Sequence, residues 1–134
     1  MAGVVVLDAS TLIALHDESD SHHPWALDLL RSTLSDEWVM SGLTYAETLV
    51  HPLRAGRVDE FERSVVGLGI VVADLMASDA RSVAALRAST QLRMPDAIVL
   101  QLAISTQGVL ATADLRLARG AVVLGLSVAC PTLD

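Results

Sequence analysis

The sequence contains no lysine, and all nine of its basic residues are arginine. A chain without lysine cannot supply the phosphate-binding lysine of a Walker-type loop, a Schiff-base lysine or the lysine of a response-regulator receiver. Sixteen acidic residues outnumber the nine arginines, which gives a net charge of −7 with histidine neutral. This balance argues against binding nucleic acid through a general basic surface, so a polyanionic substrate would need local arginines or bound metal ions.

Cysteine and aromatic residues are also scarce. The single cysteine, Cys130, cannot form an intrachain disulfide and lacks the partners of a zinc site, so nothing indicates an oxidising compartment. Two tryptophans, one tyrosine and one phenylalanine are too few for a base-stacking platform of the single-strand-binding kind. We expect these aromatic side chains in the core or in an interface.

Long hydrophobic runs are missing. The apolar stretches 65–73 and 121–130 are much shorter than the ~20 residues that span a bilayer, and both contain glycine. The first eight residues lack a cationic segment and already include an acid, which is unlike a signal peptide. We therefore expect a soluble cytoplasmic protein without a membrane partner.

The pattern that is present favours an α/β fold. A chain of 134 residues with 52% hydrophobic residues can build one core, so we expect a single domain over residues 1–134. Short β-branched runs alternate with amphipathic segments, as in βαβ units around a mostly parallel sheet. The predicted strands are 4–7, 38–40, 70–72, 109–112 and 127–129, and the predicted helices are 10–15, 24–34, 44 to before 56, 58–66, 78–88, 95–108 and 115–119.

Three local details of these helices are also predicted. Leu27, Leu30 and Leu34 form the inward stripe of one helix. Pro52 bends or ends the helix that contains it, because proline lacks a backbone N–H. Gly108 provides a left-handed C-terminal cap for the helix that Pro95 opens.

Four carboxylates stand at the ends of apolar segments. Asp8 follows Val4-Val5-Val6-Leu7, Glu47 follows Leu43-Thr44-Tyr45-Ala46, Asp96 follows Pro95, and Asp114 follows Val109-Leu110-Ala111-Thr112-Ala113. The carboxyl ends of parallel strands meet at one edge of a sheet, where open α/β proteins build their sites. The presumed parallel strands would bring Asp8 and Asp114 to that edge, and the starts of helices would bring Glu47 and Asp96.

Each acid also has a purely local interpretation. Asp8 or Ser10 is a suitable N-cap, and Asp114 is a suitable N-cap for the next helix. Glu47 completes a Thr44-x-x-Glu47 capping box, and Asp96 lies in a first helical turn, where the helix dipole favours an acid. Each local interpretation is adequate for one acid. Four separate local roles explain less well why all four acids stand at the ends of apolar segments.

Clustering of the four acids would require cations. Two carboxylates ~4 Å apart repel by about 4 kcal/mol at an effective dielectric constant of 20. Carboxylate oxygens suit Mg²⁺ or Mn²⁺ better than a zinc site of cysteine and histidine would. A site of this type hydrolyses phosphodiesters, because the metal activates the attacking water and stabilises the leaving oxygen.

The four segments, in this order, resemble a PIN domain. They are Val-Leu-Asp8-Ala-Ser10, Leu43-Thr44-x-x-Glu47, Pro95-Asp96-Ala97 at the start of an apolar helix, and Leu110-Ala-Thr112-x-Asp114. At this length the chain looks like a VapC-type toxin ribonuclease of a bacterial toxin–antitoxin pair. The resemblance implies an α/β/α sandwich with a central parallel sheet, a Mg²⁺- or Mn²⁺-dependent endoribonuclease acting on RNA, a homodimer, and inhibition by a small antitoxin protein at the acidic cleft.

The resemblance also assigns roles to residues. Asp8, Glu47, Asp96 and Asp114 match the family's acidic positions and would coordinate the metal directly or through water, while Ser10 and Thr112 would orient a ligand or water. The chain departs from many relatives at Leu117, where they carry an aromatic residue. The contribution of Asp114 is therefore less secure than that of the other three acids.

Other polar residues are weaker candidates. Arg54, Arg57 and Arg93 could contact phosphates, since arginine binds phosphate in a bidentate manner, but they are equally ordinary as surface charges. Arg93 is the most open of the three because it lies three residues before Asp96. His22 and His23 fit an exposed loop, and His16 and His51 have no histidine partner at i,i+4, so we assign none of the four to catalysis or metal binding.

Two other functional classes remain for comparison. A haloacid-dehalogenase-type phosphatase needs a second aspartate two residues after the first and a lysine, but Ser10 occupies that position and lysine is absent. A catalytically silent module of the same fold that only binds RNA or protein is compatible with the sequence. Loss of metal-dependent cleavage in folded Asp8→Asn or Asp96→Asn variants would discriminate against it.

Overall fold

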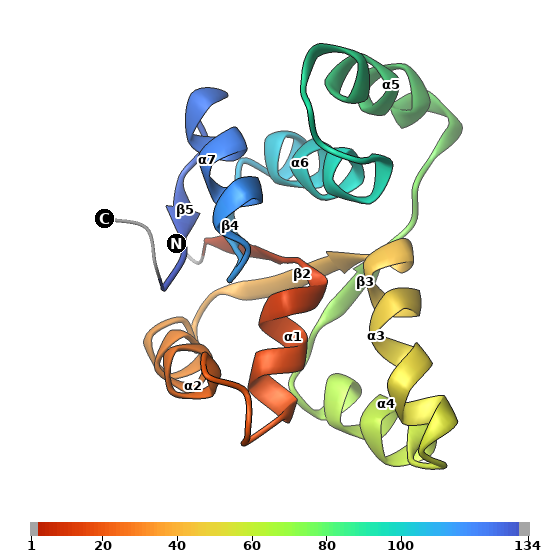
Figure 1. Ribbon diagram of the computed structural model, residues 1–134, viewed down its shortest axis with the longest axis vertical. Coiled ribbons are helices and arrows are strands. Elements are labelled where there is room, and N and C mark those ends of the chain that lie inside the picture. Colours follow the sequence, from red (N-terminus) through yellow and green to blue (C-terminus); the bar gives the residue numbers. More distant parts are fainter. Residues whose placement is uncertain (1–2, 132–134) are drawn as a thin grey trace.

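Five parallel strands form the centre of the molecule, in the spatial order β3-β2-β1-β4-β5 (Figure 1). The computed structural model describes residues 3–131, so the outer bounds of the predicted domain lie outside the described residues. The predicted α/β fold with a central parallel sheet is confirmed, and all four strand pairings are parallel. The strands are β1 (Val4–Leu7), β2 (Glu37–Ser41), β3 (Val71–Ala73), β4 (Val109–Ala111) and β5 (Val128–Ala129).

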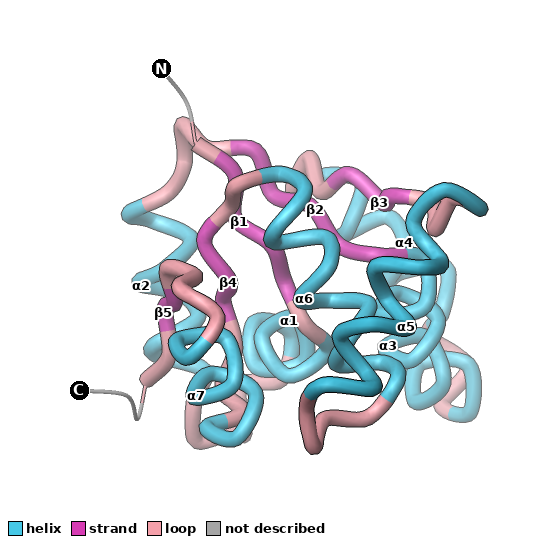
Figure 2. Tube along the Cα trace, turned by 90° about the horizontal axis from the view of Figure 1, so that it is seen from above, coloured by secondary structure: helices cyan, strands magenta, loops and turns pink. Residues whose placement is uncertain are grey.

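Helices cover both faces of this sheet (Figures 1 and 2). Helices α1, α2 and α4 lie on one face, and α6 lies on the other with α5 packed outside it. The helices are α1 (Ala9–His16), α2 (His23–Ser32), α3 (Gly42–Arg54), α4 (Val58–Gly67), α5 (Ala80–Ser89), α6 (Met94–Thr106) and α7 (Leu115–Val123), with a short 3₁₀ turn, η1 (Ala77–Asp79).

Strand β1 explains why the core has two halves. Val5 and Leu7 pack into the cluster under α1, whereas Val6 packs with Leu100 and Leu110 into the cluster under α6. Successive side chains of a strand point to opposite faces, so a continuous apolar run is suited to burial on both sides. The aromatic residues lie where we expected them: Trp38 is buried, and Trp25, Tyr45 and Phe61 pack against the first half of the core.

Two of the three local details predicted for the helices were wrong. Helix α2 ends at Ser32, and Leu34 is 76% exposed, so it is not part of the inward stripe. The left-handed residue after α6 is Gln107, with φ 54°, and not Gly108. Gly108 instead lies close to β1, where an added Cβ would come within 3.0 Å of the Val4 carbonyl oxygen.

Helix α3 begins earlier than predicted. Ser41 is its N-cap and accepts a hydrogen bond from the Thr44 backbone N–H at 3.0 Å, so Thr44 and Glu47 do not form the capping box. The helix continues through Pro52 and ends at Arg54, before Gly56 as expected. Helix α7 is also longer than predicted and extends to Val123. Within residues 3–131, no helix combines the length and the apolar character needed to cross a membrane.

Candidate active site

The strand order reverses between β1 and β4. From β1 the chain moves outward to β2 and β3, and after returning to β4 it moves to the other edge at β5. Ligands of open α/β sheets bind outside the carboxyl ends of the strands at such a reversal. Asp8 directly follows β1 and Asp114 lies three residues after β4, so the topology itself directs these two carboxylates to the same crevice.

All four predicted acids line one small cleft at this position. Asp8, Glu47, Asp96 and Asp114 surround a volume of about 140 Å³, together with Ser10 and Arg93. Helix α3 contributes Glu47 and the first turn of α6 contributes Asp96, so four separate elements build the cleft. The structure therefore brings together all four acids, Ser10 and Arg93.

Asp8 is the most constrained of the four acids. It is buried, and its Oδ1 accepts hydrogen bonds from the Ser10 hydroxyl at 2.7 Å and the Thr11 backbone N–H at 3.1 Å. Its Oδ2 accepts the Thr112 hydroxyl at 2.5 Å. Burial raises the pKa of Asp8 above the ordinary value of 3.8, and the hydrogen bonds from Thr112, Ser10 and Thr11 oppose that rise.

Ser10 and Thr112 serve first to position this carboxylate. Besides donating to Asp8, the Ser10 hydroxyl accepts the Ala113 backbone N–H at 2.9 Å, and Thr112 Oγ1 accepts the Asp114 backbone N–H at 3.0 Å. The two hydroxyls therefore fasten the start of α1 to the end of β4. Because they connect Asp8 with the segment that carries Asp114, they fix the relative positions of two cleft acids.

Glu47 differs from the other acids because it does not cap a helix. Among residues 3–131, no group donates a hydrogen bond to its carboxylate, which lies exposed at the rim of the cleft. Partial desolvation raises the pKa of Glu47 above 4.5, and the charges of Asp96 and Asp8 raise it further, against the lowering effect of Arg93. Because the charges of Asp8 and Asp96 raise the pKa of Glu47, the three carboxylates lie close enough to act as one site.

The capping and ligand interpretations of the other acids are compatible, because a carboxylate has two oxygens. Asp114 Oδ1 caps α7 by accepting the backbone N–H groups of Arg116 and Leu117, and its Oδ2 lies 3.8 Å from Arg116 Nη2. Asp96 Oδ2 accepts the Arg93 backbone N–H at 3.2 Å. Within the described part of the chain, Asp96 Oδ1 has no hydrogen-bond partner, so caps leave oxygens available for a ligand.

An arginine that the sequence analysis overlooked also reaches the cleft acids. Arg116 Nη2 lies 3.0 Å from Asp96 Oδ2 and 3.8 Å from Asp114 Oδ2. A cation two residues after an N-cap opposes the helix dipole, and this unfavourable placement was the available sequence signal. Arg93 is more distant, with its Nε 4.0 Å from Asp96 Oδ2.

The donor set fits a hard divalent cation. Among residues 3–131, the side-chain acceptors that line the cleft are carboxylate and hydroxyl oxygens, and Asp8, Asp96 and Asp114 retain acceptor capacity after capping. Among residues 3–131, no three acidic, histidine or cysteine side chains are already close enough together to hold a metal ion. The side chains would therefore have to draw together around a cation, which would offset their repulsion.

The weaker candidates fall into two groups. Arg93 lines the cleft, whereas Arg54 lies exposed in the last turn of α3 and is not among the cleft-lining residues. Arg57 lines a larger groove of about 700 Å³ between α1, α3 and α4, which also contains Glu47. This groove therefore opens beside the acidic cleft.

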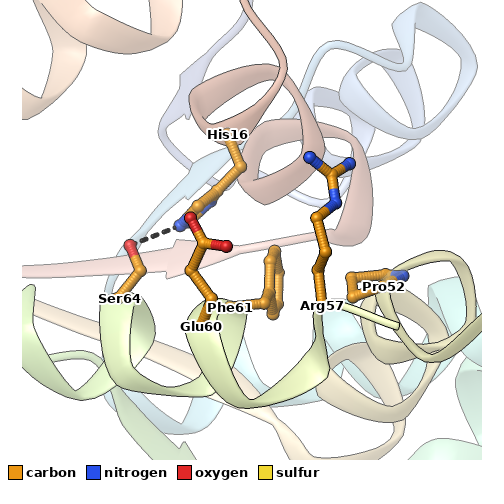
Figure 3. Close-up of a pocket in the computed structure, with 6 residues that line it drawn as sticks. All are labelled: His16, Pro52, Arg57, Glu60, Phe61 and Ser64. Atoms are coloured by element: carbon orange, nitrogen blue, oxygen red, sulfur yellow. Dashed lines mark hydrogen bonds between the residues drawn. The ribbon is translucent and has the colours of Figure 1, made fainter. Parts of the chain in front are cut away.

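His16 lies in a hollow of about 200 Å³ next to that groove, and its ring is used structurally (Figure 3). Its Nδ1 donates to the Leu12 carbonyl oxygen at 3.0 Å, because a carbonyl can only accept, and its Nε2 is hydrogen-bonded to the Ser64 hydroxyl at 2.7 Å. The ring also packs against Phe61 with centroids 4.6 Å apart. His16 therefore connects α1 to α4 and is not among the residues that line the acidic cleft.

Fold and site together define an α/β protein with an acidic cleft at the carboxyl edge of a parallel sheet. The family model for the PIN domain matches residues 5–123, so the chain belongs to the PIN domain family. No curated protein matches the sequence. The resemblance found in the four acidic segments is thus confirmed at the level of the family.

Solved structures of toxin–antitoxin proteins share this fold. A VapC20 toxin from Mycobacterium tuberculosis that cleaves the sarcin–ricin loop has a TM-score of 0.71 at 15% identity, over 86% of this chain and 93% of that one. DNA-bound VapBC from Salmonella typhimurium has a TM-score of 0.69 at 19% identity, over 97% and 98%. A toxin–antitoxin complex from Klebsiella pneumoniae has a TM-score of 0.70 at 22% identity, over 82% and 86%.

Proposed function

We propose that this chain is an endoribonuclease that depends on Mg²⁺ or Mn²⁺ and hydrolyses RNA phosphodiester bonds as the toxin of a toxin–antitoxin pair. The observation that carries the proposal is the convergence of Asp8, Glu47, Asp96 and Asp114 on one cleft at the sheet reversal. Its support from relatives is the family membership and the similarity to a toxin described as cleaving the sarcin–ricin loop.

The four acids would hold the cation, with Asp8 and Asp96 as the buried ligands and Glu47 and Asp114 at the rim. A bound divalent cation would supply a Lewis acid for the phosphate and lower the pKa of the attacking water. Ser10 and Thr112 keep the Asp8 carboxylate in a fixed orientation. The guanidinium of Arg93 at the cleft edge would bind a phosphate of the RNA.

The partners follow from the same proposal. Relatives of this fold were solved as toxin–antitoxin complexes, which supports a small antitoxin as the inhibitory partner. Exposed apolar side chains such as Val123, 86% exposed, and Leu53, 59% exposed, support burial of surface in a homodimer or in that complex. Light scattering after gel filtration should find a dimer, and a monomer at high concentration would contradict the homodimer.

The first experiment is cleavage of a mixed pool of structured RNAs by the purified protein with Mg²⁺, Mn²⁺ or EDTA. We expect cleavage with either cation, none with EDTA, and loss of cleavage in Asp96→Asn. Asp28→Asn is the matched control, because it makes the same chemical change at a 76% exposed side chain on α2. Cleavage that persists in EDTA or in folded Asp96→Asn would refute the proposal.

Absence of cleavage in every sample would favour a catalytically silent module of the same fold. RNA binding without cleavage, measured by filter retention with the same pool, would then be the supporting observation for that alternative.

A further inference from the structure

We infer that Arg116 is an internal counterion of the carboxylate cleft, which holds Asp96 and Asp114 together in the metal-free protein and competes with the divalent cation for Asp96. The inference rests on the proposed function, since it concerns the cation that this function requires. One guanidinium nitrogen carries both contacts, at 3.0 Å to Asp96 Oδ2 and 3.8 Å to Asp114 Oδ2.

Both the backbone N–H and the guanidinium of Arg116 contact the cleft acids. Its backbone N–H donates to Asp114 Oδ1 at 3.0 Å, while its side chain faces Asp114 Oδ2 and Asp96 Oδ2. A positive charge in the first turn of α7 is unfavourable to that helix, so helix stability does not explain it. The hydrogen bond to Asp96, twenty residues earlier in the chain, does explain why an arginine stands in this turn.

Arg116 is better placed for this role than Arg93. The Arg93 side chain is 74% exposed and its Nε is 4.0 Å from Asp96, whereas Arg116 is 49% exposed and makes a hydrogen bond. A charge-assisted hydrogen bond of this kind is stronger than a longer-range ion pair. Arg116 is therefore the arginine that competes most directly with a metal ion for the negative charge of Asp96.

The charges in the cleft are consistent with such an exchange. Four carboxylates and Arg93 line the cleft, and Arg116 contacts two of the four acids, so their formal charges sum to −2, which one divalent cation would balance. A metal ion bound to Asp96 would weaken the attraction between this carboxylate and the Arg116 guanidinium. The half-exposed side chain can then turn toward solvent, where an RNA phosphate provides another partner.

The test is calorimetric titration of Mg²⁺ and Mn²⁺ into the full chain without RNA, for wild type, Arg116→Gln and Arg119→Gln. Arg119 is the matched control, because it lies one turn further along α7, is exposed, and forms no ion pair among residues 3–131. We expect Arg116→Gln to bind the cation about three- to tenfold more tightly than wild type, and Arg119→Gln to change affinity by less than about twofold. A larger rise of the melting temperature with metal should accompany the tighter binding.

Equal or weaker metal affinity in Arg116→Gln than in Arg119→Gln would overturn the inference. Failure of Arg116→Gln to bind any divalent cation would also overturn it, because removal of a competitor should expose the site. Arg116→Lys keeps the charge but cannot form the same planar contact, so we expect its affinity between those of wild type and Arg116→Gln. Since no RNA is present, this result is independent of whether the protein cleaves RNA.

Discussion

The Thr112 hydroxyl donates to Asp8 Oδ2 at 2.5 Å and joins residues that are 104 positions apart in the chain. Thr112 also accepts the Asp114 backbone N–H, so one buried hydroxyl holds two of the four cleft acids. Parallel pairing of β1 with β4, with Leu7 opposite Ala111, places the two residues side by side. Long-range order in the cleft therefore depends on a threonine that is not among the residues lining the cleft.

Replacement of Thr112 with valine should destabilise the protein by about 1–3 kcal/mol, because the Asp114 N–H loses its acceptor and Asp8 loses a donor in a buried site. It should also raise the pKa of Asp8, since the Thr112 hydrogen bond lowers it. Urea unfolding and NMR titration of the Asp8 carboxyl group measure the two effects. Thr112→Ser keeps the hydroxyl, so an Asp8 pKa that rises equally in both variants would contradict the explanation.

Asp8→Asn should increase the melting temperature of the metal-free protein at pH 7. The folded-state pKa of Asp8 lies above 3.8, so the fold favours the protonated acid, and wild-type stability falls as pH rises from 3.8 through that higher value. Neutral asparagine avoids this loss, and its carbonyl oxygen can still accept the Thr11 N–H. Melting curves from pH 3 to 8 in EDTA should therefore diverge as pH rises.

With Mg²⁺ or Mn²⁺ present, the order of the two proteins should reverse, because only wild type gains stability from binding the cation. An Asp8→Asn variant that is less stable than wild type at every pH in EDTA would show that the hydrogen bonds to Asp8 outweigh its burial.

Gln107→Gly should stabilise the protein by about 0.5–1 kcal/mol, because Gln107 is a non-glycine residue at φ 54° and its side chain is exposed. The neighbouring change Gly108→Ala should destabilise by about 1–3 kcal/mol, since its Cβ would approach the Val4 carbonyl oxygen and Val6. Denaturant midpoints distinguish the two effects. Stabilisation by Gly108→Ala would mean that β1 shifts to make room for the added Cβ.

Ser64→Ala should destabilise the protein by about 0.5–1.5 kcal/mol, because it removes the hydrogen bond between Ser64 and His16 that joins α4 to α1 (Figure 3). Alanine is also the better helix former, so the comparison needs a control. Ser105→Ala in α6 makes the same change at an exposed hydroxyl that bonds only within its own helix. In thermal melts, Ser64→Ala should have a lower melting temperature than Ser105→Ala. Equal melting temperatures would mean that the His16–Ser64 hydrogen bond does not stabilise the fold.

Much of the fold was predictable because burial leaves a direct pattern in the residues. The run Val4–Leu7 had to lie in the centre of a sheet, and it does, with residues alternating between the two halves of the core. The ends of elements were less predictable. Ser41 and Thr44 are both acceptable caps, and only the path of the chain leaving β2 made Ser41 the N-cap of α3.

The site was predictable to the same degree. The types and positions of the four acids indicated a cleft, but the partners of each oxygen were not readable from spacing. Arg116 was missed because a single exposed arginine near a helix start carries no periodic signal, and its role depends on Asp96 in another element.

The sequence by itself determined the class of the protein: alternating apolar segments specify a parallel α/β sheet, and acids at the ends of those segments specify where its chemistry can lie. The tertiary structure decided which strand pair carries the reversal, and thereby that Asp8, Asp114 and Thr112 meet. It also decided which arginine faces the acids. The physical reason is that burial acts on each residue nearly independently, whereas hydrogen bonds and ion pairs depend on distances that exist only after the elements have packed.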